Sequence, residues 1–519
     1  MDEYRKKRPE TSQDLPGKAA SLWLDTTPET DFPVLERPLR VDTAIVGGGI
    51  VGLTTALLLQ EAGLNVAVIE SGRIVTGVTA NTTAKITALH GITYQKLVST
   101  FGHEGAQTYA NANQIAIAKI AALIEKEAID CDFQWTFACT YTVSEKNAGR
   151  IEEEVRATEK IGLPTYFMET TDLPYPVKGA ICLKDQARFH PRKYLLALAV
   201  RFTGSGGLIF ESTRAIGIKK GRLPEVVTER GSVRAQDIII ATNYPFFDPA
   251  FYFTRLYPIR SYVYGVRLNT PSPEGMYISI EDQFHSVQNH PMEGGDILLI
   301  GGLQHKTGHG GNTIGYYDRL ERFARENFDL KSIDFHWSTQ DNWTPDNVPY
   351  IGPASPFHKN LYVATGFAGW GMAHSMVAAT ILSDAVLGRH SDWAPLYNPT
   401  RFKPSGTYSF AKENIHVAKT FVEERLMKAE PLDIGSLQPD EGCVMQGGHG
   451  KVAVAKDSQG VIHAVSPVCT HLGCIVSWNN AEETWDCPCH GSRFSGDGQV
   501  IHAPAFKDLE KKHFKEEER

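Results

Sequence analysis

The first strong pattern of apolar and polar positions lies between residues 39 and 70. Two short, mostly apolar runs, Val41–Val46 and Asn65–Ile69, predict two buried strands. A glycine-rich turn follows the first run, the residues up to about Gln60 predict a helix, and Gly63 is its stop signal. Strand, helix and strand in this order predict one βαβ unit with parallel strands.

The end of the chain has a different pattern. Residues 451–456 and 461–465 alternate in polarity on either side of Asp457–Gly460, which predicts a β-hairpin. A charged helix is predicted for residues 411–429, and the nearly all-charged tail, residues 507–519, is expected to extend into solvent. We therefore expect a small antiparallel β domain after a connecting segment.

Length and composition indicate a soluble protein with several domains. A chain of 519 residues exceeds one ordinary core, and 42% hydrophobic and 22% charged residues are typical of globular proteins. The net charge of −8 and the sequence pI near 6.1 give no basic footprint, so no nucleic acid partner is expected. Residues 1–18 lack an apolar core, and no run of about 18 apolar residues occurs, so neither a signal peptide nor a membrane span is expected.

Eight cysteines divide into two groups. Four gather in a short C-terminal stretch. Scattered cysteines are typical of a reducing compartment, so we expect a cytoplasmic location. The scattered ones are Cys131, Cys139, Cys182 and Cys443.

The glycine turn of the βαβ unit predicts a nucleotide site. Gly47 permits the tight turn, Gly49 lets the backbone approach a pyrophosphate, and Gly52 lets helix and strand pack closely. Glu70, at the end of the second strand, has a carboxylate that could accept both hydroxyls of an adenosine ribose. This motif does not choose between NAD and FAD.

Two short stretches near the C-terminus predict an iron–sulfur centre. Each offers one thiolate and one imidazole, the set that a Rieske [2Fe–2S] cluster needs when two histidines replace two cysteines on one iron. Cys469 and Cys487 would hold one iron, and His471 and His490 the other. A structural zinc site is the alternative, because paired Cys/His spacings are also typical of zinc.

The motif resembles the Rieske proteins of cytochrome bc complexes. Each stretch has a spare cysteine, and in that family the two, here Cys474 and Cys489, form a disulfide. Zinc binding gives no reason for them. In the high-potential members the second loop continues with Ser and, two residues later, Tyr, whose hydroxyls donate hydrogen bonds to sulfur. Ser492 is present here, but the tyrosine position is Phe494, so we expect an intermediate cluster potential.

Residues 20–395 resemble the D-amino-acid-oxidase-like flavoproteins. The closing segment, residues 343–387, carries the resemblance, together with residues 77–83, 189–192, 237–243 and 294–302 in the same order. The resemblance implies FAD, with the glycine-rich turn and the following helix start beside the flavin pyrimidine. A helix N-terminus would stabilise negative charge there. The additional cofactor-binding residues that it implies are Gly77, Thr79, Thr365, Gly366, Gly371 and Met372.

The resemblance also implies the fold class. We expect an α/β protein with an FAD/NAD(P)-binding Rossmann-like domain, an interleaved α+β substrate domain and a small all-β Rieske domain. The expected FAD domain is discontinuous, about 20–100, 170–250 and 330–395. The substrate domain would comprise about 100–170 and 250–330, followed by a linker at 396–431 and the Rieske domain at 432–510.

Together, the two sites predict an FAD-dependent oxidoreductase. It would oxidise a small amine or amino acid by hydride transfer to FAD and send single electrons through the cluster to an unknown acceptor. In the family the substrate is usually oriented by side chains from the sheet that roofs the flavin. Alternation places Tyr262 and Tyr264 on one face of such a strand. The candidates for catalytic residues are Arg260, Tyr262, His305 and Trp370.

Other functions fit the same motifs. Electrons could enter through the cluster while the flavin reduces a substrate, or the chain could be a non-catalytic redox sensor or electron carrier. Intact Gly47, Gly49, Gly52 and Glu70 count against a degenerate flavin fold. A Rieske oxygenase would need two histidines and one carboxylate on a mononuclear iron, and the sequence has no convincingly spaced set.

Overall fold

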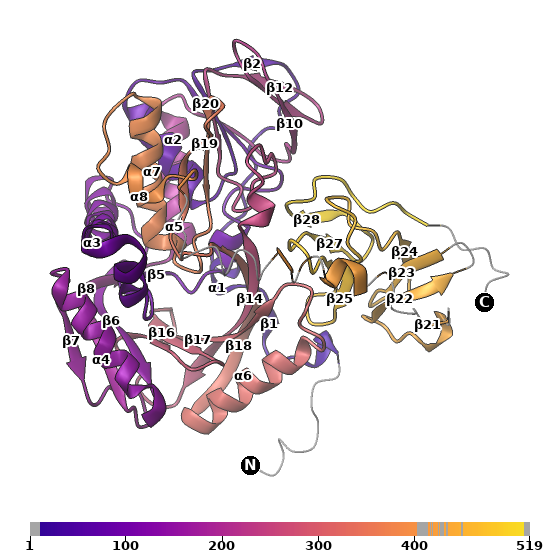
Figure 1. Ribbon diagram of the computed structural model, residues 1–519. Coiled ribbons are helices and arrows are strands. Elements are labelled where there is room, and N and C mark those ends of the chain that lie inside the picture. The colour runs from indigo at the N-terminus through magenta and orange to yellow at the C-terminus, as the bar shows by residue number, and fades with distance from the viewer. Residues whose placement is uncertain are drawn as a thin grey trace.

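The computed structural model of the protein describes residues 11–401, 414–415, 417, 419–423, 425, 430–431, 434–447 and 450–512. The smaller C-terminal domain, yellow in Figure 1, lies beside the larger part of the chain. The helix predicted for residues 411–429 lies largely outside the described residues, although those described between 414 and 425 are helical. Within the described ranges, no helix is both long and apolar enough to cross a membrane.

The predicted βαβ unit is confirmed and forms the centre of a six-stranded sheet. β3 (Thr43–Val46) and β4 (Val66–Ile69) are parallel neighbours, and α2 (Ile50–Glu61) connects them. The strand order is β19-β20-β13-β3-β4-β9, and every pair except β19 with β20 is parallel. The other strands are β9 (Leu208–Phe210), β13 (Asp237–Ile240), β19 (Tyr350–Ser355) and β20 (His358–Thr365).

This sheet is buried on both faces. Ile45 packs in a core with α2, α3, α5 and α7, whereas Ala44 and Val46 pack in a second core with a four-stranded sheet. Strands that are covered on both faces usually have sequences of consecutive apolar residues, as β3 and β4 do. The covering elements are α3 (Tyr94–Lys126), α5 (Pro191–Gly204), α7 (Gly371–Val386), β2 (Leu39–Arg40), β10 (Ala215–Lys219), β11 (Glu225–Thr228) and β12 (Ser232–Arg234).

A ten-stranded sheet forms the second unit, in the order β1-β18-β14-β17-β16-β15-β6-β8-β5 with β7 paired to β8. α4 and α6 pack on it, and the short helices α1 and α8 lie outside it. The bounds are β1 (Lys18–Ala19), β5 (Lys85–Ile86), β6 (Gln134–Thr142), β7 (Thr165–Met168), β8 (Gly179–Arg188), β14 (Tyr257–Leu268), β15 (Met276–Ser279), β16 (His285–His290), β17 (Ile297–Lys306), β18 (Leu330–Trp343), α1 (Leu22–Asp25), α4 (Glu145–Lys160), α6 (Ile314–Asn327) and α8 (Ala394–Tyr397).

The pairing of strands divides the chain differently from the predicted boundaries in three places. β5, β8 and β18 were expected in the FAD domain, but all three belong to the ten-stranded sheet. The reason is continuity of the hydrogen-bond ladder: β18 pairs with β14 from Leu330 to Trp343, and β8 pairs with β6 from Gly179 to Arg188. The chain therefore crosses between the two units more often than the resemblance implies.

The C-terminal domain consists of two four-stranded sheets, and the predicted hairpin is confirmed as the antiparallel pair β23 and β24. One sheet has the order β21-β22-β23-β24 and the other β25-β26-β27-β28. Their bounds are β21 (Glu430–Pro431), β22 (Gly442–Gly447), β23 (Gly450–Lys456), β24 (Ile462–Val465), β25 (Ser477–Asn479), β26 (Thr484–Asp486), β27 (Arg493–Ser495) and β28 (Val500–His502).

Specific polar contacts join this domain to the ten-stranded sheet and α6. Arg260 of β14 lies 3.3 Å from a carboxylate oxygen of Glu482. Gln340 of β18 donates a hydrogen bond of 2.9 Å to the Gly491 carbonyl oxygen. Thr313, just before α6, donates one of 2.7 Å to Asn479. These contacts fix the face of the domain that meets the larger part of the chain.

Two of the four scattered cysteines form a disulfide that the sequence did not predict. Cys139 on β6 and Cys182 on β8 stand directly opposite each other and are bonded. The two cysteines are 43 residues apart in the sequence, and only the register of β6 and β8 brings them side by side. Cys131 is a buried free cysteine.

Candidate flavin cavity and cluster-binding loops

The glycine turn after β3 has no room for side chains at two positions. A Cβ on Gly52 would lie 1.9 Å from the Gly47 carbonyl oxygen. A Cβ on Gly47, whose φ is +114°, would lie 2.5 Å from the Ala241 carbonyl oxygen. Gly49 is the N-cap of α2, and a helix N-terminus favours a phosphate group. The turn therefore suits a pyrophosphate.

Glu70 follows β4 and holds the glycine turn with its carboxylate. Its Oε2 accepts a hydrogen bond of 2.8 Å from Gly48 N, and its Oε1 accepts one of 2.9 Å from Gly72 N. An acidic group beside the turn is suitable for ribose hydroxyls. The expected dinucleotide residues are thus assembled at one end of β3 and β4.

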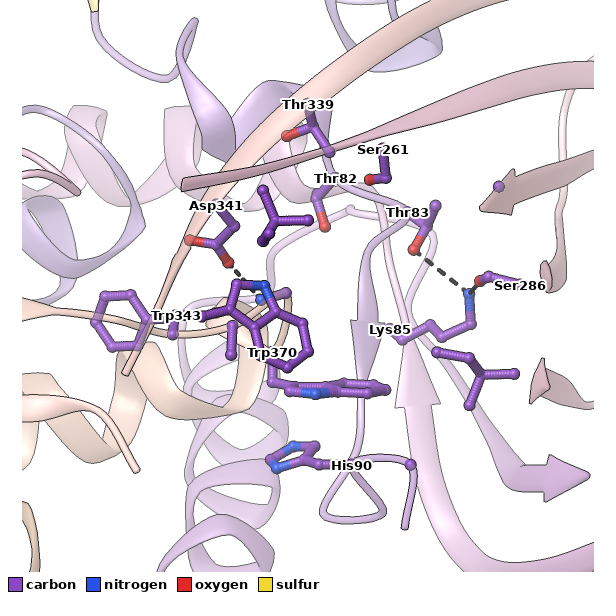
Figure 2. Close-up of a pocket in the computed structure, with 18 of the residues that line it drawn as sticks. Thr82, Thr83, Lys85, His90, Ser261, Ser286, Thr339, Asp341, Trp343 and Trp370 are labelled. Carbon is purple, nitrogen blue, oxygen red and sulfur yellow. Dashed lines mark hydrogen bonds between the residues drawn. The ribbon is translucent and has the colours of Figure 1, made fainter. Parts of the chain in front are cut away.

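A cavity of about 490 Å³ lies between the N-termini of α2 and α7 and the ten-stranded sheet. Ile50 borders it on α2, Met372 on α7, and Ser261, Gly301 and Thr339 on β14, β17 and β18. Figure 2 shows hydroxyl and charged side chains from several elements around this space. Two helix N-termini at one cavity favour a ligand that carries or develops negative charge.

Trp370 and His90 stack on one side of the cavity (Figure 2). Their ring centroids are 4.7 Å apart with planes inclined by 25°. His90 is held by Tyr109 and by the Thr87 carbonyl oxygen, each at 2.7 Å, and burial lowers the pKa of His90 to about 3. The imidazole is therefore neutral, and the pair forms a rigid aromatic wall.

Lys85 is a buried lysine whose ammonium group reaches the cavity. Its Nζ donates hydrogen bonds to Ser286 and, at 3.4 Å, to Thr83 (Figure 2). Burial lowers the pKa of Lys85 to about 7, since no carboxylate compensates for the loss of water. A site of this kind can bind a carboxylate, which would restore the ordinary, higher pKa.

Asp341 ties β18 to the turn before α7. Its carboxylate accepts hydrogen bonds from Gly369 N and, at 2.8 Å, from Asn342 N. Burial raises the pKa of Asp341 to about 6, and these two bonds act in the opposite direction. Asp341 therefore fixes the turn that carries Trp370 to the cavity.

The structure places the predicted cofactor residues around one end of the cavity. Thr79, Gly371 and Met372 line it, and Trp370 is the only predicted catalytic residue that does so. Thr79 also accepts a hydrogen bond of 3.2 Å from Ile50 N, at the start of α2. The remaining predicted residues lie in or next to the adjoining turns, with Gly52 in the first turn of α2 and Thr365 at the end of β20: Gly47, Gly49, Gly52, Glu70, Gly77, Thr365 and Gly366.

The other three predicted catalytic residues lie away from the cavity. Arg260 and Tyr262 are on the face of β14 opposite to Ser261, and Tyr262 donates to or accepts from His305 at 2.8 Å. Tyr262 stacks on Tyr316 of α6. A strand presents alternate residues to opposite faces, so the face of β14 that holds Tyr262 is not the face that lines the cavity.

The two loops expected to hold the cluster have matching backbone geometry. Cys469 N donates to the Cys474 carbonyl oxygen and Gly473 N to the Cys469 carbonyl oxygen, at 2.8 and 2.9 Å. Cys487, Gly491 and Ser492 repeat this pattern at the same spacing. Both glycines have positive φ, +81° and +74°, which favours glycine at each loop end. Each loop is therefore a tight turn around its cysteine.

The four expected ligands fit an iron–sulfur cluster. Cys469 and Cys487 are buried free thiols whose side chains contact each other, and the Nδ1 atoms of His471 and His490 are buried without a hydrogen-bond partner. Burial lowers the pKa of both imidazoles, to about 4 and about 3, so both are neutral, as metal ligands must be. The structure pairs Cys474 with Cys489 in the disulfide that the family resemblance implies.

Ser492 and Phe494 lie beside these ligands. Ser492 hydrogen-bonds the Cys469 thiol and accepts a bond of 3.0 Å from Ala505 N. Phe494 is fully buried in the same core as Cys469 and Cys487. The serine is thus placed to donate to a ligand sulfur, and position 494 has no hydroxyl to do the same.

The histidine side of the cluster loops faces the larger part of the chain. The ring of Phe253 lies 5.4 Å from that of His490 and 5.9 Å from that of His471, as centroid distances. A Cβ on Gly491 would come within 2.4 Å of Pro258. The loops are therefore packed against the segment that leads into β14.

The strands β14 and β18 lie between the two candidate sites. Ile259 and Thr339 line the cavity. Their neighbours Pro258 and Gln340 pack against Gly491 in the second cluster loop, and Gln340 donates a hydrogen bond to its carbonyl oxygen. This pair of strands therefore has the cavity on one side and a cluster loop on the other.

Sequence reasoning missed Lys85, Asp341, Phe253 and Gln340. Lys85 had a usable signal, since it is the one charged residue within the apolar stretch Ala84–Leu89. The other three acquire their roles from contacts between segments far apart in the sequence. No local pattern marks such contacts.

Comparison with protein families gives two matches. Residues 42–385 match the model of the FAD dependent oxidoreductase family, and residues 432–513 match that of the Rieske [2Fe-2S] domain. The chain is also 38% identical over 492 residues to YhfW of Bacillus subtilis (strain 168), which is named as a Rieske 2Fe-2S iron-sulfur protein. That alignment covers 94% of this chain and 96% of YhfW.

Solved structures share the fold of the larger part. Glycine oxidase from Geobacillus kaustophilus aligns with a TM-score of 0.59 and 20% identity, covering 70% of this chain and 99% of that one. L-amino acid deaminase from Proteus vulgaris aligns with a TM-score of 0.58 and 15% identity, covering 72% and 100%. At such identities the likeness shows the fold alone.

Proposed function

Since the chain belongs to the FAD dependent oxidoreductase family and carries a Rieske [2Fe-2S] domain, we propose that it oxidises a small amine or amino acid at FAD and passes the electrons through the cluster to a separate acceptor. FAD accepts a hydride and releases electrons singly, and a Rieske cluster carries one electron at a time. The chain's own residues must then bind the substrate, exclude water and keep the two cofactor sites in contact.

The observation that carries the proposal is the contact between the two sites. Ile259 and Thr339 line the cavity, and their neighbours Pro258 and Gln340 pack against Gly491 in the second cluster loop. Phe253, just before β14, packs edge-on against the rings of His471 and His490. A cluster held this close to the cavity wall favours electron exchange within one chain over a role for either domain alone.

The cavity supports a substrate with a carboxylate. Lys85 is the buried cation there, and Thr83 and Ser286 hold its ammonium group in place. The structurally similar proteins named above are a glycine oxidase and an L-amino acid deaminase, both named for amino acids. We therefore favour an amino acid over a simple amine.

The walls of the cavity support hydride transfer. Trp370 and His90 form an apolar stacked wall that keeps water away from the reacting carbon. Gly371 and Met372 begin α7, whose positive end would stabilise negative charge on a reduced flavin ring. No side chain in this proposal acts as a dedicated base, because direct hydride transfer needs none.

The remaining parts of the proposal concern location and partners. We keep the cytoplasmic location as a proposal, although the bond between Cys139 and Cys182 removes two of the four cysteines that supported it. The electron acceptor is a second molecule that reaches the cluster loops. Leu472 in the first loop is 47% exposed and leaves one approach open.

Anaerobic mixing of the holoprotein with a panel of amines and amino acids tests the proposal. Flavin bleaching and cluster absorbance are followed together. We expect an amino acid to bleach the flavin and then to reduce the cluster. If the panel leaves the flavin oxidised while a reductant of the cluster bleaches it, electrons run in the opposite direction and the proposed function is wrong.

A further inference from the structure

Gln340 on β18 is a buried amide that joins three parts of the chain. Its Nε2 donates a hydrogen bond of 2.9 Å to the Gly491 carbonyl oxygen in the second cluster loop. Its Oε1 accepts one of 2.9 Å from Thr307 Oγ1, just after β17. A buried polar group costs free energy unless it is paired, and both ends of this amide are paired. The amide therefore has one fixed orientation.

The hydrogen bond from Gln340 meets the cluster loop beside an expected ligand. Gly491 directly follows His490, and Gly491 N donates to the Cys487 carbonyl oxygen at 2.9 Å. A Cβ on Gly491 would lie 2.4 Å from Pro258 and 2.9 Å from Gln340 Nε2. Gln340 therefore holds the residue that closes the loop between two of the four expected ligands.

A second contact holds the other end of the same loop. The Nε2 atom of His309 lies 3.1 Å from the Pro488 carbonyl oxygen, and a Cβ on Gly308 would lie 2.5 Å from Pro488 Cα. Gly308 and His309 follow β17, whose Gly301 lines the cavity. Both ends of the loop 487–491 are therefore held by segments that continue into the cavity wall.

Only the thickness of the sheet separates this loop from the cavity. Thr339 lines the cavity (Figure 2), and the next residue, Gln340, has its side chain on the opposite face of β18. A continuous route of covalent bonds and one hydrogen bond therefore leads from Thr339 through Gln340 and Gly491 to His490.

We propose that Gln340 is a positioning residue for electron exchange between the flavin and the cluster. It keeps the loop that carries Cys487 and His490 at a fixed distance from the cavity, and its hydrogen bond is part of the route that the electron crosses. Each transfer oxidises one cofactor by one electron and reduces the other by one electron. No bond of the route forms or breaks, and any proton released at the flavin goes to solvent.

The inference rests on the part of the proposed function that places FAD and the cluster in one electron path. It holds for either direction of electron flow and for any substrate, so its test uses no substrate. Its failure would leave the oxidation of an amino acid to be decided by the substrate panel. Conversely, an inactive panel would leave this inference standing.

The test is the rate of electron exchange between the two cofactors in the full-length holoprotein, started by a laser flash with a photoreduced deazaflavin as the electron donor. Gln340→Met has a side chain of similar length that cannot donate to Gly491. We expect exchange to slow at least about tenfold, within the loss of about 100-fold that a misplacement of about 1 Å can cause. The content of FAD and acid-labile sulfide should be unchanged.

The midpoint potentials of both cofactors are measured on the same protein, by redox titration with EPR for the cluster. They separate a change in position from a change in driving force. We expect both potentials to stay near those of the parent. A slower rate that shifted potentials explain in full would overturn the proposal.

Gln340→Glu is the second variant, for the case that Gln340→Met loses a cofactor. Its carboxylate has the shape of the amide and can still accept from Thr307 Oγ1. Arg260, which stands opposite position 340 in the β14–β18 ladder, favours the ionised form, and that form cannot donate to Gly491. Exchange should slow in this variant too, and a rate equal to that of the parent would contradict the proposal.

Thr313→Val is the matched control. It removes another buried hydrogen bond across the same interface, from Thr313 Oγ1 to Asn479 at 2.7 Å, which does not involve the cluster loops. This variant should exchange electrons at the rate of the parent. Equal slowing in Thr313→Val and Gln340→Met would show a general docking effect, and no slowing in Gln340→Met would show no effect of position; either result would overturn the proposal.

Discussion

Arg260 and Glu482 form an ion pair that joins the ten-stranded sheet to the Rieske domain. The guanidinium Nη2 lies 3.3 Å from the carboxylate, and the arginine side chain is only 1% exposed. Arg260 also hydrogen-bonds Ser338 and has the charge of Asp486 nearby. Its environment is that of a docking residue, and the cavity lies on the other face of β14.

Glu482→Gln should therefore weaken docking of the two domains. Removing one partner of a buried pair costs about 3 kcal/mol or more, and the partial exposure of Glu482 reduces this to about 1–3 kcal/mol. We expect slower reduction of the cluster by flavin electrons, with the content of both cofactors unchanged. Rapid mixing measures that rate. Asp508→Asn is the control, because its pair with Arg214 also bridges the domains but is exposed, so it should change the rate little.

Lys85→Met tests the carboxylate site. A charge-assisted hydrogen bond contributes about 1.5–3 kcal/mol, so KM for an amino acid should rise at least about tenfold, while KM for the matching amine without a carboxylate changes little. Lys119→Met, on the exposed side of α3, is the control. An equal effect on both compounds would assign Lys85 a structural role.

The pH dependence of substrate binding gives an independent test of Lys85. The pKa of about 7 means that the ammonium form predominates below pH 7 and the neutral amine above it. Binding a carboxylate then requires uptake of a proton at higher pH, so KM should rise by about tenfold per pH unit above the pKa. The Lys85→Met protein should lose this dependence. A KM that falls with pH in the parent protein would contradict the assignment.

Gly49→Val should abolish FAD binding and leave the cluster in place. A side chain at the N-cap of α2 would block the approach of a pyrophosphate and would crowd Thr79, whose Oγ1 lies 3.1 Å from a Cβ built there. Flavin and acid-labile sulfide are assayed on the same purified protein. Gly63→Val, at a position with open space around it but positive φ, controls for general destabilisation. If the Gly49→Val protein loses both cofactors while the Gly63→Val protein keeps them, the two domains do not fold independently.

Ser492→Ala should lower the potential of the cluster, and Phe494→Tyr should raise it. Ser492 contacts the Cys469 thiol, and Phe494 is buried in the core that contains Cys469 and Cys487. Each change removes or adds one hydroxyl that can donate to sulfur. Redox titration measures both. An unchanged potential in the tyrosine variant would show that residue 494 does not face the cluster.

Local motifs made much of the fold predictable from the sequence. The conformation of the turn from Gly47 to Gly52 depends mainly on the residues within it. The same is true of the two cluster loops. The face of β14 that lines the cavity was not predictable. Alternation places Tyr262 and Tyr264 on the same face but does not say which face that is. The packing of Tyr262 on α6 shows that these two residues face away from the cavity.

The contact between the two cofactor sites was also beyond sequence reasoning. Phe253, Pro258 and Gln340 meet the cluster loops only when the two domains dock, and their spacing along the chain has no period. The pairing of Cys139 with Cys182 was missed for a similar reason, since it depends on the register of β6 and β8. Interactions set by register and docking require the folded chain.

The order in which substrate electrons reach the two cofactors tests the central claim most directly. An amino acid that reduces the parent protein is mixed anaerobically with that protein and with a His490→Ala variant, while flavin and cluster absorbance are recorded. We predict that flavin absorbance falls first and the cluster follows in the parent, and that the variant reduces its flavin at nearly the same rate with no onward transfer. Reduction of the cluster before the flavin, or loss of flavin reduction in the variant, would contradict the account.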